Sequence, residues 1–375
     1  GNDSAPYRLS DVYNPITPNF GSNPMYSVPN SQQNPDLVNE LTTEVEFGFL
    51  IKLFDNRLSI DAAYYDRITE DQIFNVPVSS TTGYTSKLLN AGKMKNSGLE
   101  LQIAGTPIQT EDFQWNVGLN LTSQNNEVVE LLKDEDGNTV VESINAGNTW
   151  AADLRVQEGL PYMALFGQDY VYDDGGNRLV DANGNYQFTD DRVYLGSAIA
   201  DWTGGFNTSF TYKNFTLSAL FDFQVGGVIH STSLQWSKYS GMHPETVSFN
   251  GESDARANGM ILPGVKADGS ANDIRVDPQT YYQTYWRRAA PNVYDASFVK
   301  FRDIRLSYAV PAAVLGKTPF TSLNLSAYGR NLGILYSEVP FIDPQVITGA
   351  GNAQGLENAQ VPATSSFGFN ISAKF

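Results

Sequence analysis

The chain of 375 residues contains no cysteine, which excludes a disulfide framework and fits an oxidising compartment. It is also short of positive charge, with 24 Lys and Arg residues against 41 Asp and Glu residues and a net charge of −17. Binding to nucleic acid needs concentrated Lys and Arg at the phosphates, so this composition argues against a nucleic-acid partner.

Long apolar runs are missing as well. A membrane-spanning helix needs about 20 consecutive apolar residues, whereas the longest candidate, residues 47–54, is short and contains Lys52. If the chain spans a membrane, it therefore spans it as strands. The polar start, from Gly1 to Ser4, does not resemble a signal peptide. We expect either that an N-terminal part was removed or that the chain belongs to a longer one.

The strongest positive signal is an alternation of apolar and polar residues with period two, which puts successive side chains on opposite faces of a strand. In residues 45–53 every odd position is apolar, and among the even positions only Leu50 breaks the pattern. The pattern predicts nine strands, at residues 45–53, 58–65, 99–103, 115–121, 206–212, 215–223, 304–310, 323–328 and 367–375.

The connections between these strands alternate in length. Short links at residues 55–57, 106–112, 213–214 and 311–319 alternate with long ones at 75–92, 127–196, 230–296 and 333–362. Short turns at one end and long loops at the other are typical of outer-membrane barrels. A soluble half-buried sheet also alternates, but it needs a covering layer, and no amphipathic helix of useful length is visible. The predicted fold class is an all-β, antiparallel transmembrane β-barrel.

The number of predicted strands is odd. The first and the last strand both run towards the short-turn end, and the last one finishes at Phe375. Bacterial single-chain barrels have an even number of strands and must close. We therefore expect at least one further strand from outside this chain. The predicted organisation is an extracellular loop segment at residues 1–42 and the C-terminal part of a barrel at residues 43–375.

Several short motifs, each weak alone, carry a family resemblance through their order and spacing. They are Asn34-Pro35-Asp36-Leu37, Tyr64-Tyr65, Asp71-Gln72-Ile73, Thr82-Gly83-Tyr84, Asn90-Ala91-Gly92, Asn96-Ser97-Gly98-Leu99-Glu100, Gly204-Gly205-Phe206, Tyr212-Lys213-Asn214-Phe215, Arg330-Asn331-Leu332 and Asp343-Pro344. Together they resemble SusC-like (SusC/RagA-type) TonB-dependent transporters of the Bacteroidota outer membrane, from about residue 34 to residue 375.

That resemblance implies a barrel of 22 strands, of which this chain would supply the last nine. It also implies an N-terminal plug and a TonB-contacting segment, neither of which is visible in this sequence. The terminal Phe375, on an alternating strand, resembles the signal read by the barrel-assembly machinery.

Signals for catalysis are poor, and we predict no enzyme and no catalytic residues. The sequence shows no nucleophile elbow, P-loop or zinc signature. Its two histidines, His230 and His243, both fall in one predicted loop. A hydrolase triad built on one of them is the alternative to the ordinary case of a solvated loop histidine.

A weak calcium candidate lies in the long, acidic loop at residues 127–192. Asp181, Asn183 and Asn185 have the alternate spacing of oxygen ligands in an EF-hand loop. However, Tyr186 stands where that loop needs Gly, and Arg192 stands where it needs Glu. The alternatives are a polar turn, or a hairpin at residues 174–177. Beyond possible calcium, we expect no cofactor.

Aromatic residues in the long loops are the candidates for substrate binding, because flat rings offer large contact areas with few rotors. The alternative is that they pack the loop against itself. The predicted substrate-binding residues are Trp236, Tyr239, Tyr281, Tyr282, Tyr285 and Trp286.

The leading hypothesis is a nutrient transporter in the outer membrane. Its lumen would be lined by polar strand residues that include Lys52, Asp61, Glu100, Asn120, Asp222 and Arg305. The resemblance implies energy supplied by TonB through the missing N-terminal part, a SusD-like surface lipoprotein as a lid, and an oligosaccharide or oligopeptide as substrate. The alternatives are a non-transporting barrel that serves as a scaffold or assembly partner and, less favoured, a soluble glycan-binding β-protein.

Overall fold

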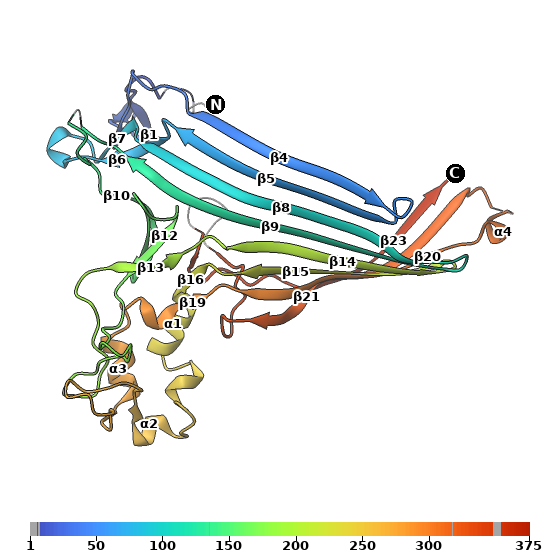
Figure 1. The fold of residues 1–375 in the computed structure, drawn as a ribbon. Helices are drawn as coiled ribbons and strands as arrows, with labels where there is room; N and C mark the ends of the chain where they lie inside the picture. The colour runs from blue at the N-terminus through green and yellow to red at the C-terminus, as the bar shows by residue number, and fades with distance from the viewer. Residues whose placement is uncertain (1–5, 7, 135, 317, 348–353) are drawn as a thin grey trace.

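The computed structural model describes residues 6, 8–134, 136–316, 318–347 and 354–375. Its main feature is one curved antiparallel sheet of nine long strands that follow one another in chain order (Figure 1). These strands are β4 (Leu41–Leu53), β5 (Leu58–Glu70), β8 (Gly92–Gln109), β9 (Phe113–Leu131), β14 (Trp202–Tyr212), β15 (Phe215–Val225), β20 (Phe298–Ala309), β21 (Ser322–Ser337) and β23 (Ser366–Lys374). All nine predicted strands are confirmed.

The pairing register gives the sheet one apolar face and one polar face. One continuous row across six strands is apolar, and it consists of Ile51, Ile60, Ile103, Leu119, Phe206 and Phe221. One residue further along, the matching row carries Lys52, Ser59, Ala104, Gly118 and Asn207. The polar face also carries all six residues predicted to line a lumen.

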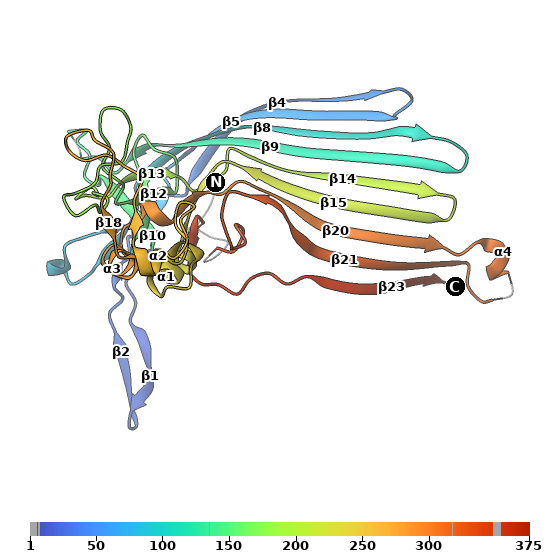
Figure 2. The same cartoon turned by 90° about the horizontal axis from the view of Figure 1, so that it is seen from below.

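No layer of described residues covers the apolar face. Phe47 and Phe369, near its two edges, are 74% and 86% exposed. A soluble protein would hide such a face against a second layer. The sheet is also open within the described residues, because β4 and β23 each pair with one neighbour only. Figure 2 shows the strands of this sheet side by side from β4 to β23, with the two edges at opposite sides of the sheet.

Two of the long connections start later than predicted. Strand β9 continues to Leu131 and β21 to Ser337, so residues 127 and 333 still belong to strands. The alternation fades at these strand ends, for example at Asn125 and Asn126, where both faces are polar. The apolar–polar alternation in the sequence therefore stops before the backbone hydrogen bonds of the strand stop.

The short connections lie at the opposite end of the sheet from the long ones (Figure 1). Between β4 and β5 the residues Phe54, Asp55 and Asn56 all have positive φ, of 55°, 54° and 66°. Between β14 and β15 Lys213 has a φ of 52°. The connection from β20 to β21 contains the short helix α4 (Ala312–Leu315).

The long connections carry the remaining elements. These are β1 (Asn14–Phe20), β2 (Asn23–Ser27), β3 (Ser31–Gln32), β6 (Ile73–Pro77), β7 (Ser86–Asn90), β10 (Ser143–Asn148), β11 (Ala152–Gln157), β12 (Ala164–Gly167), β13 (Val193–Ser197), β16 (Val228–Ser231), β17 (Met260–Ile261), β18 (Arg275–Val276), β19 (Val293–Asp295), β22 (Leu356–Glu357), α1 (Thr232–Tyr239), α2 (Ala255–Asn258), α3 (Pro278–Thr284), and the 3₁₀ turns η1 (Ser80–Thr82), η2 (Pro244–Thr246) and η3 (Ala290–Asn292). Among the described residues no helix is both long and apolar enough to cross a bilayer.

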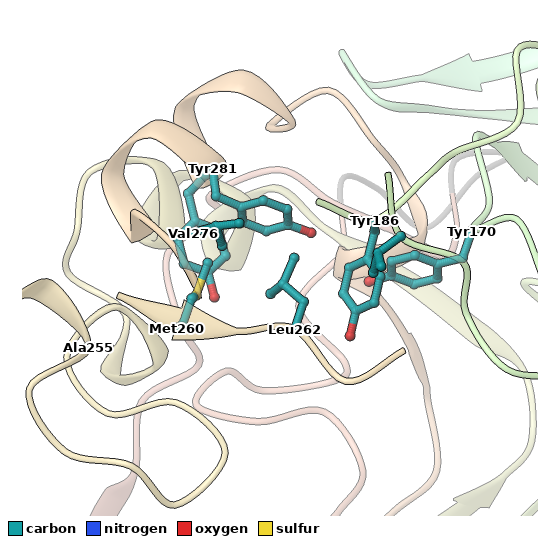
Figure 3. Close-up of a cluster of buried hydrophobic side chains, with 9 residues drawn as sticks. Tyr170, Tyr186, Ala255, Met260, Leu262, Val276 and Tyr281 are labelled. Atoms are coloured by element: carbon teal, nitrogen blue, oxygen red, sulfur yellow. The ribbon is translucent and has the colours of Figure 1, made fainter. Parts of the chain in front are cut away.

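The two longest connections, residues 132–201 and 226–297, fold together into one body, here called the loop unit. Tyr170 and Tyr186 from the first connection share a buried cluster with Met260, Leu262 and Tyr281 from the second (Figure 3). Helices α1 to α3 lie in this unit, at the end of the sheet away from the short turns (Figure 1). A common core means that neither connection holds its shape alone.

The opposite polarity of the two faces can be tested at adjacent positions of β8. Leu101 lies on the apolar face beside Leu121, and Gln102 lies on the polar face beside Asn120. We expect Leu101→Arg to destabilise the intact receptor by about 2–4 kcal/mol in lipid, because it places a charge against hydrocarbon. Gln102→Arg should change stability by less than about 0.5 kcal/mol. Urea unfolding in lipid vesicles measures both, and equal losses would contradict the face assignment.

Candidate functional site

A network of charged side chains on the polar face of the sheet links β15 and β20 to the connection between β21 and β23. Lys300 on β20 donates to Asp343 and, at 3.0 Å, to Gln345. Arg302 donates to Gln345 and, through Nε at 2.7 Å, to Asp222 on β15. The Lys300 side chain is only 1% exposed, so its charge depends on this pairing.

The six aromatic residues predicted to bind substrate separate into two groups. Tyr281 and Tyr282, on α3, are 5% and 8% exposed and belong to the core of the loop unit, against which Tyr285 also packs. These three side chains therefore pack the loops together, which was the alternative to substrate binding. Tyr281 and Tyr282 also line a cleft of about 410 Å³ beside Lys238.

The second group lies outside that core. The Trp236 ring lies 5.1 Å from Tyr239 and 5.0 Å from Trp286, measured between ring centroids. Sequence reasoning missed a fourth member, Trp150, whose ring lies 5.2 Å from Trp236 and is 54% exposed. These four residues, here called the aromatic platform, combine the two connections. In the sequence Trp150 is a lone Trp in a polar segment, 86 residues before Trp236, so no pattern links the two residues.

Two partly exposed arginines pair with the buried Asp153 close to Trp150. Asp153 on β11 accepts hydrogen bonds from Arg155 at 2.6 Å and forms an ion pair with Arg192. Arg192 also donates to the carbonyl oxygen of Trp150 at 3.5 Å. Burial lowers the pKa of both Arg155 and Arg192 below its ordinary value, although both stay protonated.

A small polar pocket adjoins the platform at Tyr239. It has a volume of about 310 Å³ and lies between the end of α1 and the start of α3. Its lining consists of Lys238, Tyr239, Ser240, Gly241, Thr246, Arg256, Asp277, Pro278, Gln279 and Gln283.

The calcium candidate folds as a tight hairpin. Oδ1 of Asp181 accepts backbone hydrogen bonds from Asn183 at 2.8 Å and Asn185 at 2.9 Å. The same arrangement recurs where Asp173 accepts from Gly175 and Asn177, at 2.9 and 2.7 Å. In the described part of the chain, no group of three or more His, Asp or Glu residues is placed to hold a metal ion. Calcium binding at Asp181, Asn183 and Asn185 stays a prediction.

Both histidines are buried, which corrects the expectation of solvated loop side chains. His230 lies on β16 between β19 and β22, and His243 caps η2 by accepting from the Glu245 backbone at 3.3 Å. Burial, assisted by the positive charge of Arg192, lowers the pKa of His230 to about 4. Among the described residues neither ring joins a serine hydroxyl to a carboxylate, which a hydrolase triad requires.

Phe375 directly follows β23. Its ring is 83% exposed and lies 5.1 Å from the ring of Phe320. Its role as an assembly signal stays a prediction.

A curved sheet with a bare apolar face, a polar face and all its large loops at one end is the wall of a transmembrane β-barrel. Residues 7–332 match the family described as "TonB dependent receptor-like, beta-barrel", and the chain belongs to this family.

Relatives and solved structures agree with this assignment. The chain is 27% identical to TonB-dependent receptor P3 of Formosa agariphila over 369 residues, covering 91% of this chain and 35% of that protein. It is 26% identical to TonB-dependent receptor SusC of Bacteroides thetaiotaomicron, covering 71% of this chain and 25% of SusC. The resemblance to SusC-like receptors is confirmed, and these proteins are named as receptors rather than enzymes.

Among solved structures, that of the RagAB peptide transporter shares the fold with a TM-score of 0.72 at 21% identity. The match covers 98% of this chain and 39% of that one. The chain thus spans about a third of the length of the relatives it matches, and it forms part of a larger barrel.

The buried pair of Lys300 and Asp343 gives a stability prediction. Asp343→Ala should destabilise the fold around residues 338–347 by about 3–5 kcal/mol, because it leaves a buried ammonium group without its counter-charge. The exposed pair of Lys266 and Asp273 provides a matched control, where Asp273→Ala should cost at most about 1 kcal/mol. Hydrogen exchange of the intact receptor measures both effects. Similar protection in the two variants would contradict a structural role for the buried pair.

A second prediction concerns pH. Because the pKa of His230 in the folded loop unit, about 4, lies below its ordinary value of 6.5, only the unfolded state binds a proton between these values. The loop unit should therefore be fully stable above pH 6.5 and lose about 3 kcal/mol as the pH falls to 4, at about 1.4 kcal/mol per pKa unit.

Hydrogen exchange of the β16 amides, corrected for the intrinsic effect of pH, measures this loss. The His230→Asn variant should show a flatter response over the same range. A response equal to that of the wild type would show that other groups cause the pH dependence.

Proposed function

We propose that the chain is part of an outer-membrane importer that takes up a nutrient oligomer and depends on TonB for energy. The observation that carries this proposal is the continuous polar face of the sheet, opposite a bare apolar face. A barrel closed from such a wall would surround a hydrophilic lumen large enough for a plug and a solute.

The folded extracellular loops support a role in capturing a large solute. Aromatic platform, polar pocket and cleft are all built on the loop unit, whereas short turns close the other end of the sheet. Among the similar proteins, RagAB is described as a peptide importer. The substrate is accordingly an oligosaccharide or an oligopeptide.

The proposal includes the parts that the family resemblance implies. An upstream plug and further strands complete the barrel, TonB acts through that upstream part, and a SusD-like surface lipoprotein covers the loops. Residues 1–42 form an extracellular segment and residues 43–375 contribute to the barrel, whose first described wall strand begins at Leu41. Phe375 serves as the assembly signal, and calcium at Asp181 would rigidify one hairpin.

Uptake by the native host tests the proposal. Deleting the TonB-contacting segment of the full-length receptor should abolish growth on the oligomer while leaving the receptor in the outer membrane. The reason is that a plug held by many contacts inside a barrel does not leave by thermal motion alone.

The control is a strain that carries the undeleted receptor and normal TonB. Surface labelling checks that the control strain and the deletion strain have the same amount of receptor. Co-purification with a SusD-like lipoprotein should persist in the deletion strain, because the loops that contact it are intact. Growth that is unaffected by the deletion would instead favour a scaffold without transport.

A further inference from the structure

Strands β1 and β2 form an isolated hairpin, here called the N-terminal hairpin (residues 14–27). Within the described residues the two strands pair only with each other. Figure 2 shows this hairpin standing clear of the other elements, at the end of the sheet that carries the long loops. A two-stranded hairpin by itself is only marginally stable in water. The N-terminal hairpin therefore needs contacts beyond its own two strands.

Hydrogen bonds hold the hairpin at its base only. The backbone of Gln33 donates to Asp11 at 2.9 Å, and the backbone of Asn34 donates to the carbonyl oxygen of Arg8 at 3.2 Å. Next to this base, β3 pairs with β7 and so attaches it to the connection between β5 and β8. Among the described residues no hydrogen bond joins residues 14–27 to any other part of the chain.

Both faces of the hairpin carry apolar side chains. Ile16 pairs with Met25 across the two strands. The neighbouring pair, Pro15 and Tyr26, points to the opposite face. Phe20 and Tyr26 are 75% and 61% exposed, and no residue of the hairpin belongs to the four buried clusters that the described residues form. Grouped apolar side chains left bare in this way mark an interaction surface.

The hairpin also carries no charge. Residues 12–35 contain no Asp, Glu, Lys or Arg, although these four residue types make up 17% of the chain. The buried cores of protein interfaces are depleted in charge. Permanent interfaces are more apolar than transient ones, so the composition favours a partner that stays bound.

Prolines limit how that partner can bind. Pro15 and Pro18 lie in β1, and Pro24 lies in β2. Proline has no N–H to donate, so it protects the edge of a strand against pairing with a further strand. The partner is therefore expected to pack on the faces of the hairpin rather than to extend its sheet.

The direction of the hairpin indicates where the partner lies. In Figure 2 the hairpin points across the long strands rather than along them, and it reaches past the level of β23. Further strands must run from the free edge of β23 round to the free edge of β4 to close the barrel. The loops of those strands would lie beside the hairpin. A partner above the barrel mouth would instead meet elements that point along the strands.

We propose that the N-terminal hairpin packs by its two faces on the extracellular loops of the barrel strands that precede this chain in the full-length receptor. The hairpin thereby holds the loop ends of those strands against the connection between β5 and β8, to which its base is attached. This inference rests on the proposed function, which includes an upstream barrel segment. It adds a contact between that segment and this chain besides the pairing of strand edges.

Photo-crosslinking in the outer membrane of the native host tests this contact. A benzophenone amino acid replaces Phe20 or Tyr26 in the full-length receptor, which is expressed together with its surface lipoprotein. Tyr172, an exposed aromatic residue of the loop unit, is the matched control position. Mass spectrometry should find positions 20 and 26 joined to receptor peptides that precede Gly1, in a product with the mass of one receptor. Position 172 should not be joined to those peptides.

Hydrogen exchange of the full-length receptor gives a second measure. We expect the paired amides of β1 and β2 to exchange at least about 100-fold more slowly than unstructured amides, because packing adds to the marginal stability of the hairpin itself. Tyr26→Ser should speed this exchange about tenfold, the size of one lost apolar contact. Tyr172→Ser, the control, should leave the exchange of the hairpin unchanged.

Three results would overturn the inference: a cross-link to the lipoprotein or to a second receptor copy, no cross-link at all, or exchange of the hairpin at the rate of unstructured amides. TonB-dependent uptake is a separate readout. If the cross-links to upstream peptides are missing but uptake requires TonB, the hairpin contact fails and the importer stands. If those cross-links form but uptake does not require TonB, the hairpin contact stands and the proposed function fails.

Discussion

The structure depends on one constraint, the need for every backbone amide in hydrocarbon to be hydrogen-bonded inside the protein. Nine strands meet it by pairing with their neighbours in an unbroken antiparallel order. Pairing also fixes the faces, because a slip of one residue would turn Phe206 inward and Asn207 outward. Alternation in the sequence and pairing in the sheet therefore enforce each other. Within the described residues β4 and β23 each have one unpaired edge, and the same constraint requires further strands to pair with these edges.

The wall could be predicted from the sequence because its signal is local. Period two is visible within residues 45–53 without knowledge of any partner, and all nine predicted strands are present. The loop unit could not be predicted, because its core joins side chains about 90 residues apart, such as Tyr170 and Met260. Nothing in the run Tyr281 to Trp286 indicates that its first two members turn inward and its last one outward. The burial of His230 and the contact of Trp150 with Trp236 could not be predicted for the same reason.

Besides the chain ends of the loop unit itself, the connection between β21 and β23 contacts both the sheet and the loop unit. Its first part is held to β20 by Lys300 and Asp343. Its later part contains Glu357, whose buried carboxylate accepts from the hydroxyls of Ser231 and Ser233 at 2.7 and 2.6 Å, at the start of α1. A carboxylate at this position also suits the positive end of the helix. Since α1 carries Trp236, the buried Glu357 links this connection to the helix that carries one member of the aromatic platform.

Three of the acidic residues in the loop unit have a structural use that is independent of any substrate. In the first long connection Asp134, Asp173 and Asp181 each accept backbone hydrogen bonds within a five-residue hairpin. Hydrogen bonds from the side chains and backbones of Asn138 and Asn177 lower the pKa of Asp134 and Asp173, as expected for carboxylates that must stay ionised to close a turn. These carboxylates therefore have a role in turn formation whether or not a cation binds beside them.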